Sequence, residues 1–517
     1  MSDKPNILIF MTDQQRGDTV LPGSRLKAQT PNLDAFGKEA VTFTHAYAPS
    51  PHCCPARTSF FTGLYPTEHG VWNNVCVQNA FSTGPNPGVR FWSDGLTEAG
   101  YRLAFNGKWH ICHERGPREF GWEEGMVTAG ARRHGQGVMG KIWDHYRDLP
   151  PPSGEPGFLP RPGYGDFKVY GTSEDPFDDG KVVHAAQNNL RELAASGDPW
   201  ALYVGTLGPH DPYTPPPEYL DLYDPADIEL PDSFQDWMED KPRLYQRMRH
   251  RLKDLTEDEQ REMIRGYLAL CSYEDKLFGD VLKTLEETGQ AKNTVVLYCS
   301  DHGDYVGEHG LWAKGLPAFE SAYHVPAMIR WPQGLQQPGR SEDAFVELVD
   351  FGPTFLELAG APVPETLRGR SLAPFLRGEH PENWRSCVCR QTNGNELYGI
   401  QRAVRTKRWK YVYNGFDFDE LYDLENDPGE CRNLAEDPDL TDIRDALCAQ
   451  MWRFAHEQND TCINEYFTVA LAPVGPGSAF DRDSTTFSKQ SELRGQEGNE
   501  DYSRLSTWSA AARKPSR

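Results

Sequence analysis

The chain has 517 residues, and 53 Lys and Arg against 76 Asp and Glu give it a formal net charge of −23. Hydrophobic residues make up 38% of the chain, which is enough for a sizeable core and excludes wholesale disorder. The acidic excess argues against nucleic acid or an anionic membrane as the main partner. No apolar run reaches the roughly 18 residues that a transmembrane helix needs.

The N-terminus and the cysteines bear on the compartment. The apolar run in the opening MSDKPNILIFMTD covers about six residues, which is too short for the core of a signal peptide. Eleven cysteines without a regular spacing favour a reduced compartment over a disulfide framework. We therefore expect a cytoplasmic protein, although a chain from which a signal peptide had been removed would show the same pattern.

Helical and apolar segments alternate along the first 330 residues. Apolar runs typical of buried strands cover Pro5–Thr12, Trp200–Gly205 and Thr294–Ser300. Helical patterns lie around Ala185–Ala195 and over Asp258–Thr288, with Gly289 where a C-terminal cap is expected. We predict an α/β fold with a large, mostly parallel central sheet flanked by helices.

The later part of the chain has a different pattern. Residues 149–180 are rich in Pro and Gly, which predicts either a binding loop or lid, or an ordered surface excursion. After Leu376, short strands at Tyr398–Val404 and Trp409–Tyr413 precede a helix near 440–457. We predict a catalytic domain over 1–376, a smaller α+β C-terminal subdomain with an antiparallel sheet over 377–472, and a polar tail over 473–517 that wraps the surface or is disordered.

Polar residues follow two of the predicted strands directly. Asp13 and Gln14 follow the first strand, and Asp301 and His302 follow Thr294–Ser300. Ligands of an open α/β sheet bind at the carboxyl ends of its strands. The four side chains therefore form a candidate site for a divalent cation, with mostly oxygen donors and one imidazole. Each pair alone would also suit an ordinary polar turn.

A third segment supports a functional role for these two pairs. Residues 49–63 read PSPHCCPARTSFFTG. Their Cys-x-Pro-x-Arg pattern, followed by Thr62-Gly63, resembles the signature of type I sulfatases in the alkaline phosphatase superfamily. In that family the cysteine of the motif is oxidised to formylglycine, and the matching position is Cys53, two residues before Pro55. The resemblance implies that a formylglycine-generating enzyme acts on this chain during maturation.

Further segments carry the same resemblance over roughly residues 5–436. They are TPNLD at 30–34, GKWH at 107–110, GPHDP at 208–212, LWAKG at 311–315 and ELYDL at 420–424. The resemblance implies that Lys108, His110, His210 and Lys314 contact the sulfate or the leaving group, and that Cys53 joins Asp13, Gln14, Asp301 and His302 around one divalent cation. Some relatives place a polar contact to the nucleophile or substrate where Asn74 stands; a hydrogen-bonded turn residue is the alternative.

The chemistry of a sulfate ester suits these residue types. The anionic ester repels nucleophiles, so cations such as Arg57, Lys108 and Lys314 must be gathered locally in this acidic chain. A hydrated formylglycine would attack sulfur with one hydroxyl, and its second hydroxyl would then lose a proton and expel sulfate. Arg57, one helical turn beyond Cys53, would steady this group, and His110 or His210 would protonate the leaving alcohol.

Two positions depart from the common family pattern. Many sulfatases have Asp-Asp and Asp-Asn where this chain has Asp13-Gln14 and Asp301-His302, and similar variants occur in choline-sulfatase-like enzymes and phosphonate monoester hydrolases. An imidazole ligand shifts the preference slightly towards Mn²⁺. By the resemblance we expect Ca²⁺, with Mn²⁺ or Mg²⁺ as alternatives.

We therefore expect a sulfatase that hydrolyses a small anionic sulfate monoester, first of a saccharide and second of an aryl or alkyl alcohol. One alternative is a phosphonate monoester or phosphodiester hydrolase of the same superfamily. Lys108 and His110 favour the sulfatase, because those hydrolases look rich in Tyr and Thr at that position. The other alternative is a non-catalytic metal- and sugar-binding relative without Cys53 oxidation, which is disfavoured because every expected catalytic position is occupied.

Overall fold

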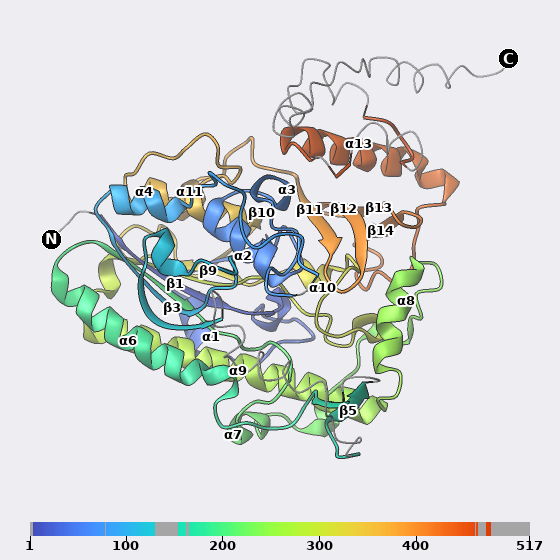
Figure 1. The fold of residues 1–517 in the computed structure, drawn as a ribbon, viewed down its shortest axis with the longest axis horizontal. Helices are drawn as coiled ribbons and strands as arrows, with labels where there is room; N and C mark the ends of the chain where they lie inside the picture. The colour runs from blue at the N-terminus through green and yellow to red at the C-terminus, as the bar shows by residue number, and fades with distance from the viewer. Residues whose placement is uncertain are drawn as a thin grey trace.

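The computed structural model describes residues 4–77, 79–129, 154–161, 165–460, 462–463 and 472–476. Its central sheet has eight strands in the order β10-β2-β9-β8-β1-β7-β3-β4 (Figure 1). These strands are β1 Asn6–Thr12, β2 Val41–Tyr47, β3 Arg102–Lys108, β4 Glu123–Ala129, β7 Trp200–Gly205, β8 Thr294–Ser300, β9 Ala327–Arg330 and β10 Arg340–Glu347.

The predicted mostly parallel sheet is confirmed. Strands β8, β1, β7, β3 and β4 pair in parallel, as do β10 and β2, whereas β9 runs antiparallel to both β2 and β8. All seven residues of the central β1 are buried, as expected for a strand covered on both faces. It begins at Asn6 rather than the predicted Pro5, since proline has no N–H for the ladder.

Helices cover both faces of the sheet. Ile7, Ile9 and Met11 pack towards α2, α4, α11 and α12, while Leu8 and Phe10 pack towards α1, α6 and α9. In Figure 1, α6 and α9 run below the sheet and α2, α4 and α11 above it. The bounds are α1 Pro31–Gly37, α2 Cys53–Thr62, α4 Trp92–Glu98, α6 Asp179–Ser196, α9 Glu257–Glu287, α11 Phe351–Leu358 and α12 Ala373–Leu376. Shorter helices are α3 Pro66–His69, α7 Pro217–Leu220, α8 Arg243–Arg249 and α10 Glu320–Tyr323.

The long helix α9 begins one residue before its predicted start, and a capping box accounts for this. The Thr256 hydroxyl accepts the Glu259 N–H at 3.2 Å, and the Glu259 carboxylate accepts the Thr256 N–H at 2.8 Å. These two bonds satisfy backbone donors that the first helical turn leaves free. Gly289 follows the helix with φ 70°, as predicted for a residue just beyond a helix end.

The proline- and glycine-rich segment is more ordered than its composition indicates. Strands β5 Phe158–Arg161 and β6 Gly165–Lys168 form an antiparallel hairpin. Leu159 and Val169 are buried in a cluster with residues of α9. Two four-residue strands are too short to show a period in the sequence, so packing against α9 decides this structure. Residues 149–153 and 162–164 of the segment lie outside the described residues.

The C-terminal α+β subdomain is present. Strands β11 Cys387–Gly394, β12 Tyr398–Thr406, β13 Trp409–Asn414 and β14 Glu420–Asp423 form an antiparallel sheet. Helix α13 Thr441–Glu457 packs against it through a shared apolar cluster. The domain boundaries at 376 and 472 stay predictions, and the predicted tail falls outside the described residues from 477 onwards.

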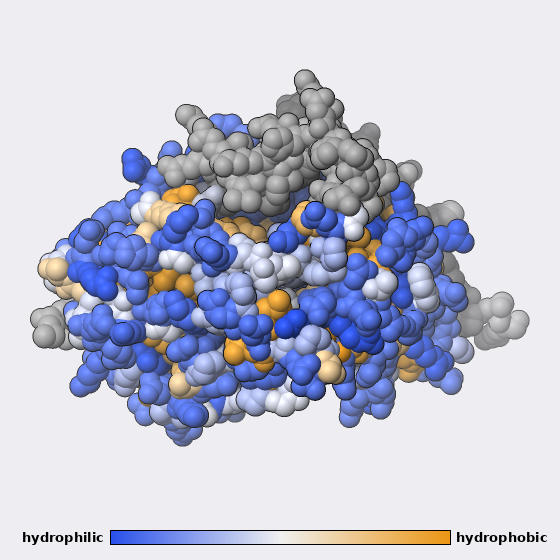
Figure 2. Space-filling view, turned by 90° about the horizontal axis from the view of Figure 1, so that it is seen from below, coloured by the Kyte–Doolittle hydropathy of each residue, from blue (hydrophilic) through white to orange (hydrophobic). Residues whose placement is uncertain are grey.

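The surface and the thiols complete the description. The face seen in Figure 2 is mainly hydrophilic, with small scattered apolar areas. Among the described residues, no helix has the length and apolar character required to cross a membrane. All eleven cysteines are free thiols, as their irregular spacing predicts.

Candidate active site

The predicted functional residues meet at one edge of the central sheet. Because β1, β8, β7 and β3 run in the same direction, the residues that follow them emerge side by side. Asp13 follows β1, Asp301 and His302 follow β8, and Lys108 ends β3. Cys53 is the first residue of α2, the buried helix that packs on this sheet.

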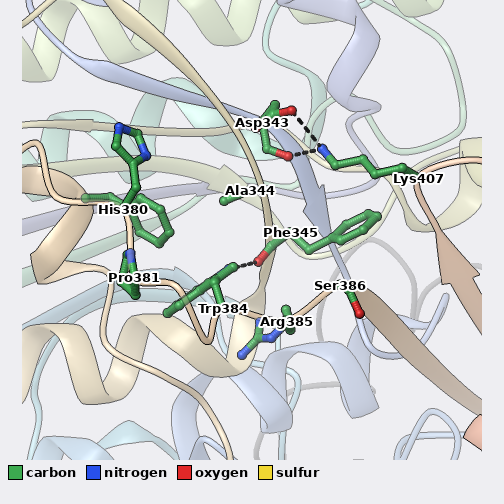
Figure 3. Close-up of a pocket in the computed structure, with 10 residues that line it drawn as sticks. Asp343, Ala344, Phe345, His380, Pro381, Trp384, Arg385, Ser386 and Lys407 are labelled. Carbon is green, nitrogen blue, oxygen red and sulfur yellow. Dashed lines mark hydrogen bonds and ion pairs between the residues drawn. The ribbon is translucent and has the colours of Figure 1, made fainter.

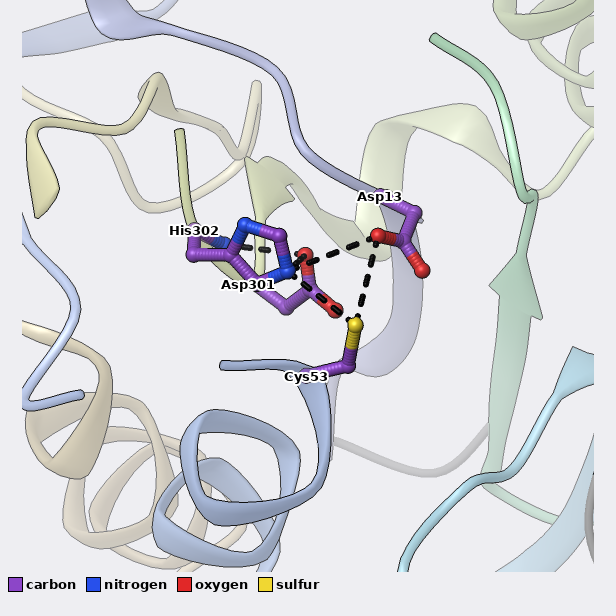
Figure 4. A group of neighbouring side chains, drawn as sticks. All are labelled: Asp13, Cys53, Asp301 and His302. Carbon is purple, nitrogen blue, oxygen red and sulfur yellow. Dashed lines mark hydrogen bonds and ion pairs between the residues drawn. The ribbon is translucent and has the colours of Figure 1, made fainter. Parts of the chain in front are cut away.

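Four of these side chains form a tight buried group (Figure 4). The ligand atoms of Asp13, Cys53, Asp301 and His302 all lie within 4.8 Å of one another. His302 Nε2 is 3.1 Å from Cys53 Sγ, 3.6 Å from Asp13 Oδ1 and 3.7 Å from Asp301 Oδ1. His302 Nδ1 donates to the Gly303 carbonyl at 2.9 Å, so Nε2 presents its lone pair to the group.

This donor set fits a divalent cation. Two carboxylates and an imidazole converge in a buried space, a combination that binds Ca²⁺, Mn²⁺ or Mg²⁺. Gln14 lies beside the group, and its backbone N–H donates to Asp301 Oδ1 at 3.1 Å. Its side-chain amide donates to Asp304 at 2.5 Å and accepts from Lys314. The role of Gln14 as a metal ligand stays a prediction.

Arg57 contacts both carboxylates of the group, those of Asp13 and Asp301. Its Nε donates to Asp301 Oδ2 at 2.7 Å, and its Nη2 lies 3.5 Å from Asp13 Oδ2. Its Nη1 donates to the Tyr203 hydroxyl at 2.9 Å and to the Lys108 carbonyl at 3.1 Å. Arg57 is completely buried, so its charge partly neutralises the carboxylates and its planar fork fixes their orientation.

Two lysines add positive charge to the site. Lys108 is buried and forms an ion pair with Asp13. Burial lowers the pKa of Lys108 to about 7, although the Asp301 carboxylate opposes this change. Lys314, between β8 and β9, is half-buried and donates to Gln14. Lys108 therefore contacts the four-residue group directly and Lys314 contacts Gln14 beside it, and the role of both lysines in sulfate binding stays a prediction.

His210 and Lys314 contact each other directly. Lys314 Nζ donates to His210 Nε2 at 2.6 Å. On the other side of the ring, Nδ1 donates to the Asp211 carbonyl at 2.6 Å and lies 3.1 Å from the Asp211 carboxylate. Burial and the charge of Lys314 lower the pKa of His210 to about 4, so the imidazole is neutral at pH 7 and accepts from the lysine.

Two further predicted residues, His110 and Asn74, lie in different surroundings. His110 is buried two residues beyond the end of β3, with a φ of 52°. The Asn74 side-chain oxygen accepts the Cys54 N–H at 3.1 Å, and the Asn74 N–H donates to Asn395 at 3.1 Å. Asn74 therefore satisfies a donor at the start of α2, and its contact with substrate stays a prediction.

The structure adds one residue, Asp304, that the motifs did not single out. Asp304 accepts from both Gln14 and the Tyr213 hydroxyl, and burial raises its pKa to about 6. In the sequence, the one indication that Asp304 belongs to the site is its position two residues after His302.

The backbone at Gln14 has a positive φ of 69°, as it also has at His110. This conformation costs non-glycine residues about 1–3 kcal/mol and is often kept at functional sites.

A separate pocket of about 270 Å³ lies elsewhere (Figure 3). Its lining includes Phe345, Trp384 and Lys407 but none of the residues above. Lys407 pairs with Asp343 at 3.3 Å, and the Trp384 indole donates to the Phe345 carbonyl at 2.7 Å. The pocket shares no lining residue with the candidate active site and is not part of it.

Comparisons with known proteins identify relatives over most of the chain. The family model described as Sulfatase matches residues 5–361, and the one described as N-sulphoglucosamine sulphohydrolase, C-terminal, matches residues 307–457. A choline-sulfatase of Rhizobium meliloti is 32% identical over 84% of this chain and 83% of its own length. An N-acetylglucosamine-6-O-sulfatase of Bacteroides thetaiotaomicron is 26% identical over 83% and 82%.

Solved structures show the same architecture. A phosphonate monoester hydrolase from Silicibacter pomeroyi superposes with a TM-score of 0.73 and 25% identity, covering 89% of this chain and 96% of its own. A 2-O glycosaminoglycan sulfatase superposes with a TM-score of 0.69 and 24% identity, covering 89% and 93%. The fold is therefore that of the alkaline phosphatase superfamily.

Proposed function

Because this chain belongs to the sulfatase family and is a sulfuric ester hydrolase, we propose that Cys53 is its nucleophilic position after oxidation to formylglycine. The observation that carries this proposal is the place of Cys53 Sγ, 3.1 Å from His302 Nε2 and 3.7 Å from Asp13 Oδ1. The hydrated aldehyde supplies a hydroxyl nucleophile and a second hydroxyl that allows sulfate to be released.

The metal-binding residues are Asp13, Asp301 and His302, together with the oxygen of the modified Cys53 and, as a fifth ligand, Gln14. A divalent cation held there supplies Lewis acidity and lowers the pKa of a bound hydroxyl. Arg57 holds the Asp301 carboxylate in place at 2.7 Å. We propose Ca²⁺ as the resident ion, because carboxylate and amide oxygens dominate this set.

Lys108, Lys314 and His110 bind the sulfate group. A sulfuryl group in transfer carries negative charge on its peripheral oxygens, and fixed cations in a buried site stabilise that charge strongly. Lys108 is bonded to Asp13, and Lys314 is bonded to the next residue, Gln14. An incoming sulfate oxygen would replace these contacts, which keep the ammonium groups directed into the site.

His210 donates the proton to the leaving alcohol. Its Nδ1 is held by Asp211 and its Nε2 accepts from Lys314 at 2.6 Å. Once a sulfate oxygen has replaced His210 as the partner of Lys314, Nε2 would take up a proton from solvent and pass it to the leaving oxygen. The Asp211 carboxylate, 3.1 Å from Nδ1, would stabilise the imidazolium. His110 is the second candidate for this role.

The leaving alcohol is a saccharide in this proposal. The Phe81 and Tyr398 rings are 51% and 46% exposed, and their centroids lie 5.0 Å apart. The Tyr398 hydroxyl donates to the Asn79 carbonyl, and Asn79 donates to the carbonyl of Asn395, the residue that also accepts from Asn74. Exposed aromatic rings linked in this way to the start of α2 suit the apolar face of a sugar.

Mass analysis of the tryptic peptide Glu39–Arg57 tests the nucleophile. Protein made together with a formylglycine-generating enzyme should carry an aldehyde at Cys53 and a thiol at Cys54. The variant C54S should keep sulfate release from an aryl sulfate, and C53A should lose it. An unmodified Cys53 in active protein would refute the proposed mechanism.

A substrate panel tests the alcohol. We expect sulfate release from sulfated saccharides, with Y398A raising KM for them and leaving KM for a small aryl sulfate unchanged. Release from aryl sulfates and from no saccharide would refute the saccharide proposal. The similarity to a phosphonate monoester hydrolase makes phosphorus esters the second candidate substrates, and a higher kcat/KM for phosphonate monoesters than for sulfates would favour them.

A further inference from the structure

Two buried carboxyl groups lie behind the segment that carries His210. Asp179 is the first residue of α6, and Glu274 is in the middle of α9. Both side chains are 0% exposed, and each carboxyl group shifts the pKa of the other. Neither residue touches the nucleophile or has a role in the mechanism proposed above.

The Asp179 carboxylate binds the backbone just before His210. It accepts the Leu207 N–H at 2.9 and 3.1 Å and the Gly208 N–H at 2.8 Å. The Gly208 carbonyl in turn accepts the Asp13 N–H at 3.1 Å. The Leu207–Gly208 segment is therefore bonded both to Asp179 and to Asp13, a predicted metal ligand.

Glu274 has no comparable donors. Across the described residues, no backbone N–H donates to its carboxyl oxygens, and the nearby side-chain donor is the Thr206 hydroxyl. Its Oε1 lies where a side chain on Gly208 would begin, 2.1 Å from an added Cβ, so the carboxyl packs directly on that glycine. Burial and the adjacent Asp179 charge raise the pKa of Glu274 well above its usual value.

Other titratable groups around the pair leave this arrangement intact. They are Asp175 before α6, Cys271 and Tyr273 on α9, Tyr298 on β8 and Lys108 on β3. Tyr273 donates to Asp175 at 3.0 Å, and Lys108 pairs with Asp13. Tyr273 and Lys108 are thus bonded to other carboxylates, and neither is paired with Asp179 or Glu274.

We propose that Glu274 is protonated and donates this proton to Asp179, and that the resulting carboxyl pair positions the Leu207–His210 segment for catalysis. Asp179 is the ionised partner because it accepts the backbone N–H groups of Leu207 and Gly208. It also stands at the start of α6, where negative charge is favoured. Glu274 is the donor because two adjacent buried carboxyl groups cannot both stay ionised, and the backbone N–H groups serve Asp179 alone. The catalytic part of this inference rests on the proposed role of His210.

The variant E274Q keeps a hydrogen-bond donor at position 274 but removes the group that can ionise. Its side-chain amide can donate to Asp179 at every pH, as the protonated acid does, whereas E274A removes the donor. We expect E274Q to keep kcat/KM for an aryl sulfate within about threefold of the wild type at pH 7, and E274A to lose about tenfold or more, mainly in kcat, because His210 is misplaced. E287Q, which changes an exposed carboxylate on the same helix, is the matched control.

Infrared difference spectroscopy at neutral pH provides a readout that does not depend on activity. The wild type minus E274Q spectrum should contain the C=O band of a protonated carboxylic acid, and the wild type minus E287Q spectrum should contain carboxylate bands instead. A carboxylate signal for Glu274, or a loss of activity in E274Q equal to that in E274A, would overturn the proposal. If the wild type hydrolysed no sulfate ester, the proposed function would fail, while the infrared result would still decide the protonation of Glu274.

Discussion

Replacement of Arg57 by lysine should damage both the stability and the activity of this protein. The guanidinium makes three hydrogen bonds, to Asp301, Tyr203 and the Lys108 carbonyl, and lies 3.5 Å from Asp13. A lysine ammonium at the end of a flexible stem cannot serve partners on both sides of the fork. The buried Asp301 carboxylate would then lose part of its neutralisation.

The size of the effect follows from these contacts. A hydrogen bond to a charged group contributes about 1.5–3 kcal/mol, and disruption of a buried ion pair costs about 3–5 kcal/mol. We expect R57K to lower the apparent free energy of unfolding by about 3 kcal/mol. Because Asp301 is also a predicted metal ligand, kcat/KM for an aryl sulfate should fall by about 100-fold.

Urea unfolding followed by circular dichroism, together with sulfate release, measures both quantities. The control Y203F removes a single hydrogen bond of Arg57 and leaves the Asp301 contact, so it should cost about 1 kcal/mol with little loss of activity. If R57K and Y203F had equal stability and equal activity, the reasoning that the planar fork orients Asp301 would be wrong.

Three further predictions address the cations, the metal and a buried acid. K314A and H210A should each lower kcat by about 100-fold or more, and the double variant should lose much less than the product, because the two side chains act through one contact; additive losses would contradict the shared role. Removal of divalent ions with a chelator should abolish sulfate release and lower the thermal midpoint, and added Ca²⁺ should restore both; unchanged activity after verified removal would exclude the metal site. Burial raises the pKa of Glu347 to about 7 from 4.5, so its contribution to stability is complete below pH 4.5 and is lost as the pH rises through 7. The free energy of unfolding should therefore fall by up to about 1.4 kcal/mol per pH unit in this window relative to E347Q, and parallel pH profiles would refute this shift.

Several elements of this protein could be predicted from its sequence because they depend on local pattern. The buried strands β1, β7 and β8 appear as apolar runs, and α9 appears as a long helical period. The polar pairs at the strand ends could be predicted to form one candidate metal site, since residues after parallel strands meet at one sheet edge. The motif around Cys53 and Arg57 lies within one helix, so its spacing is visible without the fold.

Other features depend on contacts between distant residues. The sequence contains no sign that Arg57 binds Asp301, that Asn74 supports the start of α2, or that Gln14 bridges Lys314 and Asp304. The hairpin β5–β6 was also hidden, because two short strands gain their stability from packing on α9.

The carboxyl pair shows most clearly where sequence reasoning ends. Asp179 and Glu274 are ordinary acidic residues in two amphipathic helices, and their spacing carries no motif. The layers of the fold pack α6 against α9, and this packing buries both carboxyl groups. Sequence periodicity shows which face of an element is buried. The partner of a buried charge depends instead on how the strands and helices are ordered in the fold. Such a partner is required because an unpaired buried charge costs too much free energy.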